Sequence, residues 1–157
     1  MTVTVDVSIA EDLISETPES GDDDIPEPGL LESWASAAYL NTVPAVASVR
    51  VTTADEIQRL NKNYRNKDKT TNVLSFPMQS PDEVDIRLLG DIALCASVIK
   101  QEASQQSKSE LSHWAHMVVH GMLHLQGYDH VKNDEAEIME KLEVDILKQL
   151  GFANPYK

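Results

Sequence analysis

The stretch that organises this chain is residues 109–130, which read SELSHWAHMVVHGMLHLQGYDH. The pattern predicts a helix that begins near Ser109 and runs to about Gln126, where Gly127 ends it. One apolar stripe of this helix is formed by Leu111, Ala115, Val118, Met122 and Leu125. A stripe at this spacing is typical of a helix that packs against a core with one face.

Histidines lie on another side of the same predicted helix. His120 and His124 are four residues apart, so their side chains leave one face about 6 Å apart along the helix axis. Gly127 can take a positive φ and turn the chain back, which would bring His130 beside them. Three imidazoles with room for a fourth ligand are typical of a catalytic rather than a structural zinc site, although nickel, copper or iron also accept imidazole.

Two alternatives to this ligand set remain open from spacing alone. The histidines could be core residues satisfied by hydrogen bonds, but several imidazoles along one edge of an apolar helix are costly without partners. A rival set of His116, His120 and His124 would span two helical turns, about 12 Å. We therefore expect His116 to lie beside the metal or along its groove, and His113 to serve packing or the surface.

The flanking sequence predicts four strands and five helices, mixed along the chain. We expect strands at residues 3–9, 46–51, 72–76 and 88–95, and helices at residues 29–40, 54–64, 96–106, 109–126 and 133–150. Gly90 suggests a bulge or a close approach in the last strand. Tyr64 is expected in the core, and residues 11–28 and 79–87 are expected to be loops, the first of them acidic. This order indicates one α+β (mixed α/β) domain over residues 1–157, with a small mixed sheet.

Composition and charge narrow the class of protein. The formal net charge is -13, and residues 1–49 carry ten acidic and no basic residues, which argues against indiscriminate nucleic-acid binding. Cys95 is the only cysteine, so no internal disulfide can form. We expect a reducing, cytoplasmic setting and no disulfide-linked partner. The sequence has neither the pattern of a secretory signal nor 18 consecutive apolar residues, so we expect no membrane association.

Basic residues nevertheless gather in one short segment. It contains Arg59, Lys62, Arg65, Lys67 and Lys69, with Asp68 as its one acid. Such a run is often a solvated helix face and turn. The alternative is an anion-binding patch on an otherwise repulsive protein.

The spacing H-x3-H-x5-H with a glycine after the second histidine also occurs in metzincin proteases. Those proteases carry a glutamate general base where this chain has Gly121, so the protease interpretation keeps the metal and loses the base. Residues 120–130, HGMLHLQGYDH, instead resemble the signature of the YbeY family of endoribonucleases. The resemblance extends to LNKNYRNKD (60–68), TNVLSFP (71–77) and LGDI (89–92), and covers roughly residues 45–152. Thr70 departs from it, because many members have proline there.

The resemblance implies a fold and an activity. It implies one domain with a small mixed sheet, helices around it and a metal cleft. It implies one zinc ion per chain bound by His120, His124 and His130, and a role for Arg65 in substrate binding or catalysis. The implied activity is cleavage of single-stranded RNA, in maturation of the 16S ribosomal RNA 3′ end and in ribosome quality control. The implied partners are ribosomal RNA and the ribosome or its proteins.

The residues are compatible with that chemistry. Zinc can stabilise charge that builds up on a phosphoryl group, and the planar guanidinium of Arg65 suits phosphate oxygens. Lys62, Lys67, Lys69 and His116 are further candidate RNA contacts. Arg65 could instead form a salt bridge with Asp68, and Asp129 could either support a ligand imidazole or cap its loop. The attacking group is left open between metal-activated water and the RNA 2′-hydroxyl.

Two other functions are compatible with the same residues. The chain could be a zinc hydrolase of another substrate, or a non-catalytic ribosome assembly factor with structural zinc. The open fourth position disfavours the second of these, because structural sites are usually closed by four protein ligands.

Overall fold

The computed structural model describes residues 3–13, 25–78 and 85–156. Its strands are β1 (Val3–Ile9), β2 (Ala45–Thr52), β3 (Val73–Pro77) and β4 (Arg87–Cys95). Its α-helices are α1 (Pro28–Ala37), α2 (Ala54–Arg65), α3 (Ala96–Gln105), α4 (Glu110–Leu125) and α5 (Asn133–Gln149). A short 3-10 helix, η1, covers Glu11–Leu13. Each predicted strand and helix is present in this part of the chain, with ends that differ by a few residues at most.

The strands form one mixed sheet in the order β1-β2-β4-β3. β1 runs parallel to β2 and β2 parallel to β4, whereas β3 is antiparallel to β4. Strand β1 alternates between buried Val3 and Val5 and exposed Thr4 and Asp6, as a strand with one covered face should. The predicted mixed α+β class with a small four-stranded sheet is therefore confirmed.

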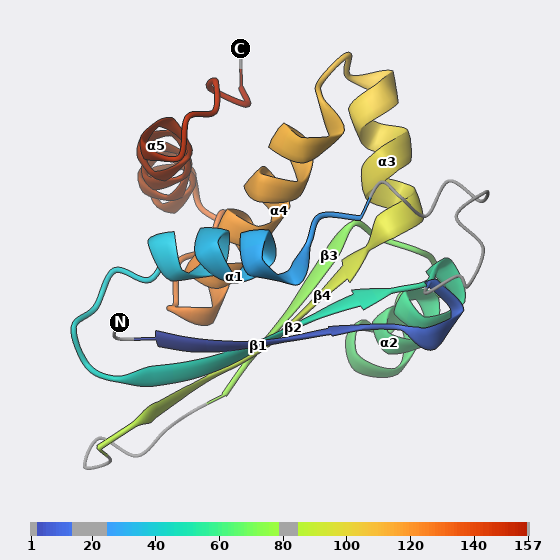
Figure 1. The fold of residues 1–157 in the computed structure, drawn as a ribbon, viewed down its shortest axis with the longest axis horizontal. Coiled ribbons are helices and arrows are strands. Elements are labelled where there is room, and N and C mark those ends of the chain that lie inside the picture. Colours follow the sequence, from blue (N-terminus) through green and yellow to red (C-terminus); the bar gives the residue numbers. More distant parts are fainter. Residues whose placement is uncertain (1–2, 14–24, 79–84, 157) are drawn as a thin grey trace.

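Helices cover both faces of the sheet (Figure 1). Successive residues of β4 belong to different cores, since Ile92 and Leu94 pack with α1, α4 and α5, while Ala93 and Cys95 pack with α2. Helix α4 lies in the larger core, where it packs on β3 and β4 of the sheet and contacts helices α1, α3 and α5 (Figure 1). Among the described residues, no helix has the length and apolar character needed to cross a membrane.

Helix α4 is more deeply buried than its sequence predicts. It begins where predicted, and Ser109 caps it by accepting a hydrogen bond from the backbone N–H of Ser112 at 3.1 Å. Its buried residues include Trp114 and Leu123 outside the predicted stripe, whereas Leu111 at the start of that stripe is 46% exposed. The helix is central and is contacted on several sides, so a single apolar face is the wrong description.

Gly90 lies at a bulge, as its position in the sequence predicts. The pairing of β2 with β4 shifts by one residue there, from Val46 opposite Leu88 to Ala47 opposite Gly90. Gly90 has φ +131°, and a Cβ at this position would clash with the backbone carbonyl of Phe76 on β3. Only glycine permits this close approach of two strands.

Two predicted loops lie partly outside the described residues. For the acidic loop at 11–28, residues 14–24 are outside, Glu11–Leu13 form η1, and Pro28 begins α1. For the loop at 79–87, residues 79–84 are outside and Arg87 already belongs to β4.

Candidate metal centre and basic groove

The three predicted histidine ligands meet at the C-terminal end of α4. Gly127 takes φ +99°, and the N–H of Tyr128 donates to the carbonyl of Leu123 at 3.1 Å, so the chain turns back directly after the helix. The turn places the His130 ring 5.4 Å from that of His120 and 5.1 Å from that of His124, between centroids. One potential ligand atom from each of the three rings lies within 4.8 Å of the others.

The donor set fits a metal ion. Nε2 of His120 and Nε2 of His124 face each other at 3.0 Å, so two ring nitrogens already converge on one point. Burial lowers the pKa of His124, and the nearby His120 and His130 lower it further. A lowered pKa favours the neutral imidazole, which is the form that binds metal. Nothing in this arrangement distinguishes zinc from other ions that imidazole binds.

The rival ligand set is not formed. Within the described part of the chain, the groups close enough to share an ion are His120 with His124 and His130, and His116 with His120 and Glu143. Nε2 of His116 is hydrogen-bonded to Oε2 of Glu143, and His116 shares no candidate ligand group with His124. His116 is 8% exposed and does not line the groove described below, so its position does not support the predicted contact with RNA.

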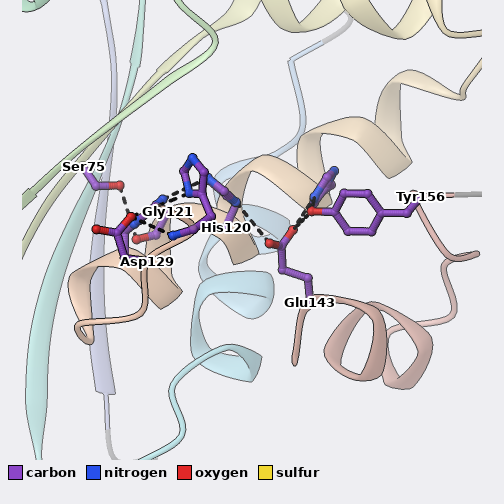
Figure 2. A network of polar contacts seen from close by, with 9 residues as sticks. Ser75, His120, Gly121, Asp129, Glu143 and Tyr156 are labelled. Carbon is purple, nitrogen blue, oxygen red and sulfur yellow. Dashed lines mark hydrogen bonds and ion pairs between the residues drawn. The ribbon is translucent and has the colours of Figure 1, made fainter. Parts of the chain in front are cut away.

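Glu143 of α5 is the residue of this region that the sequence did not reveal. Its carboxylate is buried, and it accepts hydrogen bonds from Nδ1 of His120 at 3.2 Å and from Tyr156 O–H at 3.0 Å, besides its contact with His116 (Figure 2). Burial alone would raise its pKa, but the hydrogen bonds and charges of His116 and His120 lower it to about 2. Glu143 follows Met139 by one turn on the buried face of α5, a face that the packing of the helix defines and its own sequence does not.

Arg65, at the end of α2, lines the same groove as the three histidines of α4 and its loop. This groove has a volume of about 910 Å³ and is lined by Arg65 together with His120, His124 and His130. Nη2 of Arg65 donates to the carbonyl of Ser75 at 2.6 Å, and its guanidinium carbon lies 6.0 Å from the centre of the Phe76 ring. These contacts with β3 hold the guanidinium in place.

The alternative salt bridge of Arg65 with Asp68 is not formed. Among the described residues no ion pair joins the two. Oδ2 of Asp68 lies 4.0 Å from Nζ of Lys62 instead, and Oδ1 accepts a hydrogen bond from Nε2 of Gln58 at 3.0 Å.

Lys67 and Lys69 also line the groove, on the turn that follows α2. Asn66 ends α2 in the left-handed conformation, with φ 58°. Asn61, which is buried, donates from its side-chain amide to the carbonyl of Lys69 at 3.0 Å and so ties the turn to the helix. Lys62 lies elsewhere, in a separate hollow beside Asp68, so the predicted set of RNA contacts is divided by the fold.

Other residues singled out in the sequence have mixed outcomes. Tyr64 is 68% exposed, so its predicted place in the core is wrong; its ring meets the edge of Phe76 at 5.3 Å between centroids. Of two polar residues in the motifs at 71–77 and 89–92, Ser75 lines the groove, whereas Asp91 does not and accepts a hydrogen bond from Ser48.

Asp129 caps its loop, as one of its two predicted roles requires, and makes no hydrogen bond to the His130 ring. Its carboxylate accepts from the backbone N–H of His130 at 2.7 Å, which caps the loop. The same Oδ1 atom lies 3.9 Å from Nδ1 of His130, so it is also next to a ligand ring.

Comparison with known proteins assigns the chain to a family. In fold, it is similar to the solution structure of TM1509 from Thermotoga maritima, with a TM-score of 0.51 and 22% sequence identity over 98% of this chain and 99% of that one. The family model described as "Endoribonuclease YbeY" matches residues 30–151, a range that includes most of α1, the whole of α2 to α5, the three histidines and the basic turn. The chain therefore belongs to the YbeY endoribonuclease family.

Proposed function

We propose that this protein is a zinc-dependent endoribonuclease that cleaves single-stranded RNA in the groove between α4 and the turn after α2. The observation that carries the proposal is the pairing of His120, His124 and His130 with Arg65, Lys67 and Lys69 along one groove. Membership of the family supports RNA as the substrate. A phosphodiester backbone needs cations along its path and a stabiliser of charge at the cleaved phosphate, and the two walls provide both.

Each wall has a separate task. His120, His124 and His130 would hold the ion, which when bound supplies a Lewis acid for charge on phosphoryl oxygens and for the acidity of water. Arg65 presents its guanidinium to phosphate oxygens while one N–H stays on Ser75. Lys67 and Lys69 attract neighbouring phosphates and keep the RNA strand in register.

Packing explains why a peptidase mechanism fits poorly. Gly121 stands where metzincins have their glutamate, and a Cβ at this position would lie 3.0 Å from the side chain of Ile92. Gly121 is buried against β4, so the helix has no room for a side chain there. Hydrolysis of peptides would need a base at a position that the fold keeps empty.

The biological substrate is part of the same proposal. The motif resemblance supports ribosomal RNA, with the 16S 3′ end as the site of processing and the ribosome or its proteins as partners. The free, buried Cys95 is compatible with action in the cytoplasm.

The direct test is cleavage of a labelled single-stranded RNA by zinc-loaded protein. His124→Ala, prepared in parallel, controls for contaminating nucleases, since it removes one ligand and leaves the basic wall intact. We expect cleavage by the parent protein and none by the variant; equal cleavage by both would refute the proposal. The ends of the products identify the attacking group, because a 2′,3′-cyclic phosphate requires attack by the RNA 2′-hydroxyl.

A further inference from the structure

Glu143 joins the candidate metal ligand His120 to two residues outside the groove. Figure 2 shows its carboxylate between His120 on one side and Tyr156 on the other. Oε1 faces Nδ1 of His120 at 3.2 Å, and Oε2 faces Nε2 of His116 and accepts from Tyr156 O–H at 3.0 Å. The Glu143 side chain is 1% exposed, so these contacts replace the water it has lost.

The contact with Oε1 determines which nitrogen of His120 can bind a metal. A carboxylate accepts hydrogen bonds and does not donate them, so Nδ1 of His120 must carry the proton. The lone pair of the neutral ring is then on Nε2, the atom that faces Nε2 of His124 at 3.0 Å. Metal-binding histidines commonly have such a carboxylate on their second nitrogen, where it fixes the tautomer and the orientation of the ring.

We propose that Glu143 is a positioning residue for the metal centre: it holds His120 with Nδ1 protonated and Nε2 directed at the ion, while His116 and Tyr156 hold Glu143. This role rests on the proposed function, because it requires a metal ion bound by His120, His124 and His130. It also assigns His116, which then orients the carboxylate and is neither a ligand nor an RNA contact.

A second metal site is the competing explanation of the same residues. His116, His120 and Glu143 also offer three ligand atoms within 4.8 Å of one another. An ion there would have to replace the hydrogen bonds of Glu143 with His116 and His120, and it would remove the Nδ1 proton from His120. Because His116 and Glu143 are both buried, an ion there would also lose its bound water molecules. The hydrogen-bonded network therefore accounts for the geometry better than a second ion does.

The first measurement uses the unaltered protein. Nitrogen-15 NMR of the imidazole rings in the zinc-loaded protein reports which nitrogen of His120 is protonated and which binds metal. We expect a protonated Nδ1 and a metal-bound Nε2, with one zinc per chain by metal analysis. Binding through Nδ1, or two ions per chain, would overturn the positioning role.

The second measurement compares the zinc affinity of three variants. Glu143→Gln keeps a side chain of the same size and removes the charge, and loss of such a supporting carboxylate typically weakens metal binding by about 10- to 100-fold. Glu137→Gln makes the same change of charge on an exposed position of α5 and should leave the affinity unchanged. Tyr156→Phe removes a contact to Oε2 and leaves His120 untouched, so its effect should be much smaller than that of Glu143→Gln.

Cobalt substitution provides a readout that altered folding stability alone would not move. The visible absorption of the cobalt-loaded protein depends on ligand orientation, so it should change in Glu143→Gln and stay unchanged in Glu137→Gln. If His124→Ala has lost its zinc, while Glu143→Gln keeps the parent zinc affinity and the parent cobalt spectrum, then the role of Glu143 is refuted and the metal site stands. A parent protein that binds no more zinc than His124→Ala would refute the metal site itself and the proposed function with it.

Discussion

The two halves of α4 each carry a pair of histidines, and the two pairs have different surroundings. In the first half, His113 and His116 are buried, and Nε2 of each faces a carboxylate, Glu102 of α3 at 3.0 Å and Glu143 of α5. In the second half, His120 and His124 are partly exposed, and their Nε2 atoms face each other. The same residue type is therefore structural where a neighbouring helix supplies an acid, and available to a metal where none covers that nitrogen.

His120 stands at the border of these two environments. Its Nδ1 faces Glu143, which also contacts Nε2 of His116, and its Nε2 faces Nε2 of His124 one turn further along α4, at the groove. Spacing along the helix does not create this border, because all four histidines recur at three- or four-residue intervals. The border lies where the cover provided by α5 gives way to the groove.

The largest effect should come from removing His120, and it should far exceed the effect of removing His116. We expect His120→Ala to weaken zinc binding by more than about a hundredfold, since losing a ligand should cost more than losing a supporting group. We expect His116→Ala to retain zinc within about tenfold, because it removes only one of the donors that hold Glu143. Competition with a chromophoric chelator measures both affinities. Equal losses in the two variants would place His116 among the ligands and erase the contrast between the halves.

The next effect separates the metal wall of the groove from its basic wall. Arg65→Glu should lower RNA cleavage by at least about tenfold, because it places a carboxylate where phosphate oxygens must approach. Zinc content should stay at the parent level, since the Arg65 side chain contacts Ser75 and Phe76 of β3. Cleavage rates and metal analysis on the same preparation test both halves of this expectation. Full cleavage by the variant would remove Arg65 from the mechanism.

A smaller effect should distinguish two lysines that lie close in sequence. Lys69 lines the groove, whereas Lys62 lies in another hollow near Asp68. Lys69→Glu should weaken binding of single-stranded RNA by several-fold and reduce its salt dependence by about 0.7 in the logarithmic slope per lost phosphate contact. Lys62→Glu makes the same change of charge and should leave both nearly unchanged. A larger loss in Lys62→Glu would show that RNA leaves the groove along α2.

Local patterns were sufficient to predict the elements and the three clustered histidines. Strand alternation, the Ser109 cap and the turn at Gly127 depend on neighbours within a few residues, so they can be recognised in the sequence. The ligand cluster is also a local feature, because His120, His124 and His130 lie on one helix and the turn directly after it.

Contacts between elements far apart in the chain were not predicted. Glu143 is 23 residues from His120, and α5 could have packed in any orientation as far as its own sequence shows. The deep burial of α4 was missed for the same reason, since periodicity identifies an apolar face and not the number of neighbouring elements. Tyr64 has helical spacing from the core residues of α2, yet the helix ends there and leaves the ring 68% exposed.

The smallest expected effect concerns His113, in the buried first half of α4, and appears as a dependence of folding stability on pH. Burial lowers the pKa of His113 and outweighs the hydrogen bond to Glu102, which raises it. In the unfolded chain His113 therefore binds a proton near the ordinary histidine pKa of about 6.5, whereas in the folded protein it does so only at lower pH. The free energy of unfolding therefore falls as the pH drops through that range. His113→Gln cannot take up this proton and should show a weaker loss of stability.

Urea denaturation of the parent and His113→Gln at pH 7.5 and 5.5, with a chelator in every sample, isolates this contribution from acid release of metal. The urea midpoint of the parent should fall more between the two pH values than that of the variant. A parent protein that gains stability relative to the variant on acidification would mean that His113 is protonated in the fold and forms an ion pair with Glu102. Burial would then be the lesser influence on the first half of α4, and the contrast with the second half would rest on charge instead of on exposure.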